Sequence, residues 1–133
     1  MSTGDGAGGT KVVAIRGAID AAADTPDDIK RAVTELVGQI NTRNGVAQDS
    51  IISAQFTMTA DLCSVFPASV ARDVGWSTVP MLCAVEIDVP GALPRCIRVL
   101  VHASIASSRK PEHVYLGAAA ALRPDLKPAA ARG

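Results

Sequence analysis

The segment CIRVLVHASI, residues 96–105, decides the fold because it is the clearest β-strand in the sequence. Side chains alternate between the two faces of a strand, so Arg98 faces away from the apolar residues that surround it. A guanidinium in an apolar strand is costly to bury unless it meets an anion. Arg98 therefore indicates an ion pair, a solvated sheet face or a site for an anionic ligand. The apolar face is formed by Ile97, Val99, Val101 and Ala103.

Three other segments share this strand character, being apolar and rich in β-branched residues. Pro80 must lie near the start of its strand or at a sheet edge, because proline cannot donate to the ladder. Residues 114–122 are ambiguous, since their alanines favour helix while their flanks favour strand. The three predicted strands are KVVAIRGAI (11–19), SIISAQFTM (50–58) and TVPMLCAVEID (78–88).

Two helices are predicted between these strands. Thr25 is a suitable N-cap, Pro26 suits the first helical position, and Gly45 ends the long helix. A short helix over residues 67–74 also starts at a proline and is followed by a glycine. The apolar stripe of the long helix is formed by Ile29, Val33, Leu36, Val37 and Ile40.

The order of these elements predicts an α+β fold: a mixed β-sheet with a long and a short helix on one face. The other face of such a sheet would need a partner, which fits an oligomer. We expect a disordered N-terminal tail over residues 1–10, one domain over residues 11–126, and a flexible C-terminal tail over residues 127–133.

The composition excludes several classes of protein. The chain has 133 residues, 48 % of them apolar, and a formal net charge of zero, which argues against a nucleic-acid binder. No apolar run reaches the roughly 18 residues of a membrane helix. The first ten residues lack a signal peptide, and three cysteines without CxxC spacing predict neither a disulfide framework nor a zinc site. We therefore expect a cytoplasmic protein without a bound metal.

Charged residues in predicted strands are the best candidates for a site. Arg16, Glu86 and Arg98 together look like two arginines and one carboxylate presented from neighbouring strands. Their positive balance favours a small anionic ligand, although Glu86 and Arg98 could simply pair with each other. His102 and His113 are more easily interpreted as structural or surface residues. The sequence contains no nucleophile elbow, dinucleotide-binding motif or metal-ligand pattern.

Taken together, the motifs resemble the small trimeric chorismate mutases of the α/β-barrel-like, non-helical class. The resemblance runs from about Val12 to Leu126. Its pieces occur in the family's order and spacing: IRGA (15–18), T-P-x-x-I at the helix start, VFPA (65–68), R-x-x-G-W (72–76), VP-x-x-C-x-x-E-x-DV (79–89), CIRV (96–99), HVYL (113–116) and LRPDL (122–126).

This resemblance implies a homotrimer that forms a pseudo-α/β-barrel, with active sites at the subunit interfaces. It also implies the rearrangement of chorismate to prephenate in aromatic amino-acid biosynthesis, without a cofactor or metal. Arg98 would face the ether oxygen and a carboxylate, and Arg16 would clamp a carboxylate. Glu86, helped by Cys83, would accept a hydrogen bond from the ring hydroxyl, and Tyr115 would bond a carboxylate.

The resemblance also implies which residues border the pocket. Phe66 and Arg72 would line its edge, while Leu122 and Arg123 would close it from the C-terminal side. The chain departs from the family at Leu82, where a polar residue is common, and at Ser69, where a basic residue is frequent. Leu82 is still expected to contact substrate.

Two further interpretations remain open. Cys83 and Glu86 are three residues apart, so strict alternation places them on opposite faces, and one strand could serve two pockets. The alternative functions are a Rid-type imine hydrolase or ligand-binding trimer, and a mutase-like binding protein without activity. Only a mutase would consume chorismate.

Overall fold

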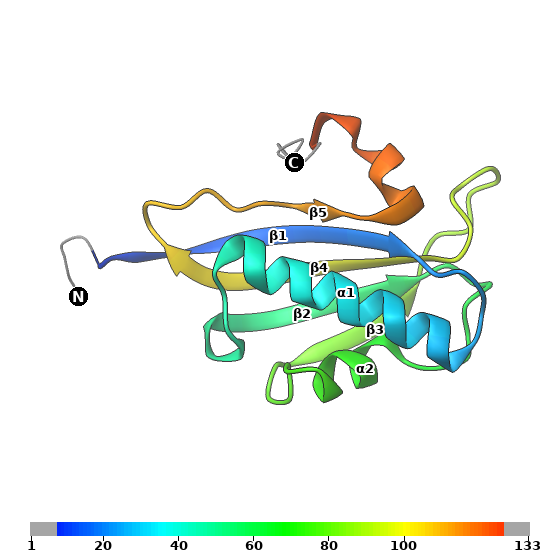
Figure 1. The fold of residues 1–133 in the computed structure, drawn as a ribbon, viewed down its shortest axis with the longest axis horizontal. Coiled ribbons are helices and arrows are strands. Elements are labelled where there is room, and N and C mark those ends of the chain that lie inside the picture. The colour runs from blue at the N-terminus through cyan, green and yellow to red at the C-terminus, as the bar shows by residue number, and fades with distance from the viewer. Residues whose placement is uncertain (1–7, 127–133) are drawn as a thin grey trace.

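The computed structural model describes residues 8–126, which form one five-stranded sheet with two α-helices on the same face (Figure 1). The strand order is β3-β2-β4-β1-β5. The central strand β4 is antiparallel to β1 and β2, while the outer pairs β2–β3 and β1–β5 are parallel. The predicted mixed α+β architecture is confirmed. The elements are β1 (Thr10–Asp20), α1 (Pro26–Asn44), β2 (Ile51–Met58), α2 (Pro67–Asp73), β3 (Met81–Val85), β4 (Cys96–Ala106) and β5 (Val114–Tyr115).

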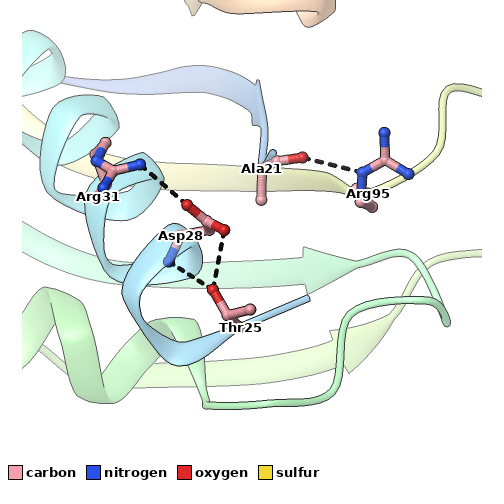
Figure 2. Close-up of polar contacts among 5 residues, drawn as sticks. All are labelled: Ala21, Thr25, Asp28, Arg31 and Arg95. Atoms are coloured by element: carbon pink, nitrogen blue, oxygen red, sulfur yellow. Dashed lines mark hydrogen bonds and ion pairs between the residues drawn. The ribbon is translucent and has the colours of Figure 1, made fainter. Parts of the chain in front are cut away.

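The start of α1 follows from its capping residues, as Figure 2 shows. The Asp28 amide donates to Oγ1 of Thr25 at 3.1 Å, and that hydroxyl donates to Asp28 Oδ2 at 3.0 Å. Nearby, Arg95 Nε donates to the Ala21 carbonyl at 3.2 Å and ties the end of β1 to the turn before β4 (Figure 2). The helix ends at Gly45, whose φ of 62° is left-handed and costs glycine little.

The hydrophobic core lies between α1, α2 and one face of the sheet. Gly17 allows α1 to approach β1, because a Cβ there would lie 3.1 Å from carbons of Leu36, Ile40 and Val99. Trp76, three residues after the end of α2, is fully buried and donates from its indole nitrogen to Asn41 Oδ1. The alternation predicted for residues 96–105 is confirmed, with Ile97, Val99, Val101 and Ala103 all buried in this core.

The opposite face of the sheet, here called the open face, is covered by neither α1 nor α2 (Figure 1). In the β1–β4 register Arg16 lies opposite Leu100 and Ala18 opposite Arg98. In the β2–β4 register Thr57 lies opposite Arg98. Because directly opposed residues share a face, the polar side chains of three strands meet there.

Two predicted segments differ from the structure. The strand predicted over residues 78–88 is shorter: β3 spans Met81–Val85, and beyond it the Glu86 amide donates to the Met58 carbonyl of β2 at 2.8 Å. The ambiguous region 114–122 divides into the two-residue strand β5 and a 3-10 helix, Gly117–Leu122. The strand signal of its first residues and the helix signal of its alanines therefore both correspond to observed structure. A second short 3-10 helix follows at Pro124–Leu126.

The predicted tails lie largely outside the described part of the chain, which excludes residues 1–7 and 127–133. β1 already begins at Thr10, one residue before the predicted domain start. Within residues 8–126, no helix has the length and apolar character needed to cross a membrane.

Candidate active site

Arg16, Glu86 and Arg98 meet at one hollow of about 240 Å³ on the open face. Arg16 comes from β1, Arg98 from β4, and Glu86 directly follows β3. The structure therefore brings together the three charged residues that the sequence singled out. The rest of the lining consists of Gln55, Thr57, Val99 and Leu100.

The charges in this hollow are only partly matched. Arg98 Nε lies 3.7 Å from Glu86 Oε1, so these two residues do form the ion pair considered as an alternative. Two guanidinium groups against one carboxylate still leave the hollow with a positive balance. Among the described residues, the buried Arg98 Nε has no hydrogen-bond partner. A buried donor without a hydrogen-bond partner is costly and suits an anionic or oxygen-rich ligand.

Thr57 is a site residue that the sequence analysis missed. Its hydroxyl donates to Glu86 Oε1, the oxygen that faces Arg98. The alternation in residues 50–58 places Thr57 and Gln55 on one face, but only the β2–β4 register shows that this face is the one with Arg98.

A second hollow, of about 490 Å³, is lined by Cys83 and Phe66. It lies on the helix side of β3, where Cys83 is paired with the buried Phe56. Glu86 lines the hollow on the open face instead. The predicted separation of Cys83 and Glu86 onto opposite faces is thus present in the folded chain.

Asp24 orders the loop beside this second hollow. Its carboxylate accepts bonds from the backbone amides of Cys63 and Ser64 at 2.9 and 3.0 Å, and from the Ser64 hydroxyl at 2.7 Å. The Ser64 side chain and then the Cys63 amide lower the pKa of Asp24 to about 2. The same carboxylate raises the pKa of the Cys63 thiol, because Sγ donates to it. The loop that leads to Phe66 is therefore held by a charged anchor.

Tyr115 and Arg123 lie together near the end of the described chain. Tyr115 is 8 % exposed on β5, and the Arg123 guanidinium lies 6.0 Å from the centre of its ring. Arg123 also pairs with Asp125 at 2.9 Å. The 3-10 helix between them is anchored by Asp20, whose carboxylate accepts from the Ala118 amide at 2.8 Å.

The remaining predicted residues do not line either hollow. Leu82 is exposed on β3 opposite Gln55, and Leu122 is exposed at the end of its 3-10 helix. Arg72 lies in the last turn of α2 and faces solvent. Across residues 8–126, no group of three or more His, Cys, Asp or Glu side chains could hold a metal ion.

Comparison with known proteins identifies the family and supports the fold. The family model for chorismate mutase type I matches residues 12–126. Chorismate mutase AroH of Thermus thermophilus is 44 % identical over 117 residues, covering 86 % of this chain and 96 % of the relative. Chorismate mutase AroH of Bacillus subtilis strain 168 is 36 % identical over 114 residues, covering 84 % and 90 %. A solved chorismate mutase from Clostridium thermocellum has a TM-score of 0.76 and 40 % identity, covering 82 % of this chain and 98 % of that one.

These matches define the class of protein as an intramolecular isomerase. The chain belongs to the type I chorismate mutase family, as the match over residues 12–126 and the two relatives show. The resemblance stated from the sequence motifs is confirmed.

Proposed function

We propose that the hollow between Arg16, Glu86 and Arg98 is where chorismate rearranges to prephenate. The observation that carries this assignment is the buried Arg98 Nε, which lacks a hydrogen-bond partner within residues 8–126 although it lies beside a carboxylate. Such a donor is suited to an ether oxygen that gains negative charge as its bond to carbon breaks. Thr57 supports the arrangement by holding the neighbouring carboxylate.

The reaction needs no nucleophile, general base or redox partner. Within one chorismate molecule a carbon–oxygen bond breaks while a carbon–carbon bond forms. The protein must hold the compact conformer in which the reacting ends are close together. Arg16 clamps one carboxylate, Glu86 accepts a hydrogen bond from the ring hydroxyl, and Tyr115 bonds a carboxylate. Arg98 supplies its permanent charge and several donors to the ether oxygen and the other carboxylate.

The second hollow supports a shared active site. Phe66 is 71 % exposed and Val85 72 % exposed, and both line this hollow with Cys83. Exposed apolar surface of this kind is typical of an interface. We assign a homotrimer in which Cys83, Phe66 and Arg72 of one subunit border the pocket that contains Arg98 of the next. Leu122 and Arg123 then close this pocket, with Leu82 at the interface.

The assay is the loss of chorismate absorbance in the ultraviolet, using purified protein without added cofactor or metal. We expect rapid loss with prephenate as the product, which feeds aromatic amino-acid biosynthesis in the cytoplasm. Folded protein that gains thermal stability from chorismate without consuming it would instead be a binding protein.

The shared site has its own test. Light scattering should give three times the 13.7 kDa mass of one chain. Arg98→Ala and Phe66→Asp subunits should each be nearly inactive alone, because one loses the charge and the other repels an anionic substrate. After subunit exchange, mixed trimers should regain activity, since some pockets then join two unmodified halves. Exchange without any recovery would show that each subunit holds a whole site.

A further inference from the structure

His113 occupies an unusual place in the sheet, where β5 begins beside β1. The parallel pairing sets Gly17 opposite Val114, and the Leu116 amide donates to the Ala18 carbonyl at 2.9 Å. If this ladder continued one step back, the Arg16 amide would donate to the backbone carbonyl of Glu112. Instead it donates to Nδ1 of His113 at 3.0 Å. The imidazole thus replaces a backbone acceptor.

Asn44 explains why the backbone acceptor has moved. Its Nδ2 donates to the Glu112 carbonyl at 3.0 Å, and its Oδ1 accepts from the Glu112 amide at 2.7 Å. Asn44 is fully buried at the end of α1, where Nδ2 also donates to the Ile40 carbonyl at 3.1 Å. The chain before β5 is therefore drawn toward α1, and His113 bridges the gap to β1.

The bridge works in only one protonation state. A nitrogen that accepts from a backbone amide has no proton, so the imidazole is neutral with its proton on Nε2. Burial, then the charges of Arg123 and Arg16, hold the pKa of His113 below its ordinary value of 6.5. These two arginines face it from the C-terminal segment and from β1, while α1 contributes the uncharged Asn44 through the Glu112 backbone. Protonation would set an N–H against the N–H of Arg16.

We propose that neutral His113 is a positioning residue, which fixes the backbone of Arg16 against β5 and weakens chorismate binding when it becomes protonated in acid. The inference rests on the proposed function through the role of Arg16 as a carboxylate clamp. Arg16 is an exposed residue of the open face, so its backbone anchor governs where its guanidinium reaches. Tyr115 follows His113 by two residues and shares this anchor.

The proposal is tested by measuring kcat and KM from pH 5 to 8 for two variants, His113→Asn and His113→Leu. Asparagine Oδ1 stands where Nδ1 stood and does not titrate, whereas leucine has no acceptor. We expect the leucine variant to raise KM about fivefold to tenfold at pH 7.5 with a smaller change in kcat, which corresponds to one hydrogen bond. In the unmodified protein KM should rise as the pH falls through the lowered pKa of His113, and this rise should vanish in His113→Asn. His102→Asn removes the other imidazole and should keep the rise.

Nuclear magnetic resonance tests the same bridge without using activity. Nitrogen shifts of the imidazole should show an unprotonated Nδ1 at pH 7.5, and the Arg16 amide should exchange faster in His113→Leu than in His113→Asn. A protonated Nδ1, or an acidic KM rise that persists in His113→Asn, would overturn the proposal. If these resonance results hold but the unmodified protein does not consume chorismate, the proposed function fails while the bridge stands.

Discussion

Arg98 Nε and Glu86 Oε1 are 3.7 Å apart, which is an ion-pair distance but too long for a hydrogen bond. The carboxylate oxygen has its donor in Thr57 instead. Glu86 is thereby held close to the guanidinium without occupying the Nε proton. The two charges of this pair balance each other, and one strong donor still lacks a hydrogen-bond partner within residues 8–126.

Thr57→Val should lower kcat/KM about fivefold, because it removes one hydrogen bond to a partly exposed carboxylate. Thr57→Ser keeps the hydroxyl and should remain close to the unmodified enzyme. The comparison is a steady-state assay of both variants at pH 7.5. Equal activity of the valine and serine variants would mean that Thr57 does not orient Glu86.

Arg98→Ala should lower kcat by roughly 10²–10³-fold, the usual loss for one donor that stabilises developing charge. Arg98→Lys should also be poor, because a point charge does not reproduce the planar fork. Arg31→Ala is the matched control, since Arg31 pairs with Asp28 at 3.0 Å on the exposed face of α1. Near-normal turnover of Arg98→Ala would remove Arg98 from the chemistry.

Acid should loosen the loop that Asp24 anchors. Because the pKa of Asp24 falls from 3.8 to about 2 on folding, the folded state binds this proton less readily than the unfolded chain. The stabilisation is therefore complete above pH 3.8 and is lost as the pH falls toward 2. Asp24→Asn should flatten this part of the pH dependence of Tm, whereas the exposed Asp49→Asn should not.

Gly117→Ala should raise KM and lower Tm. Gly117 has a φ of 57°, and a Cβ there would clash with the Asp20 carboxylate that anchors the Ala118 amide. The 3-10 helix that leads to Arg123 would have to shift. Gly38→Ala is the control, because that position lies inside α1 with open space and should tolerate or gain from alanine. Similar melting curves and KM values for both variants would contradict this account.

Much of the fold was predictable because its signals are local. Thr25, Pro26 and Gly45 mark the ends of α1, and each acts through residues within four positions along the chain. The alternation around Arg98 assigns the faces of β4 in the same way. Such signals need no knowledge of which strand pairs with which.

The contacts that complete the site could not be predicted because they join distant parts of the chain. Thr57 reaches Glu86 only through the β2–β4 and β2–β3 pairings. His113 was interpreted as a structural or surface residue, yet its partner is the backbone of Arg16, 97 residues away. Asn44 directly precedes the Gly45 that marks the helix end, and its two bonds to the Glu112 backbone depend on where β5 docks. Roles at a subunit interface stay predictions for the same reason.

The position of β3 at the edge of the sheet also affects folding and assembly. β3 has β2 on one side and no strand on the other within residues 8–126, and its Leu82 and Val85 side chains are exposed. An uncovered edge of this kind pairs readily with any extended chain it meets. If the proposed homotrimer covers this edge, correct assembly of the subunits competes with mispairing of the exposed strand. The yield of active protein recovered from denaturant should therefore be highest at an intermediate protein concentration. At low concentration subunits rarely meet, and at high concentration they aggregate.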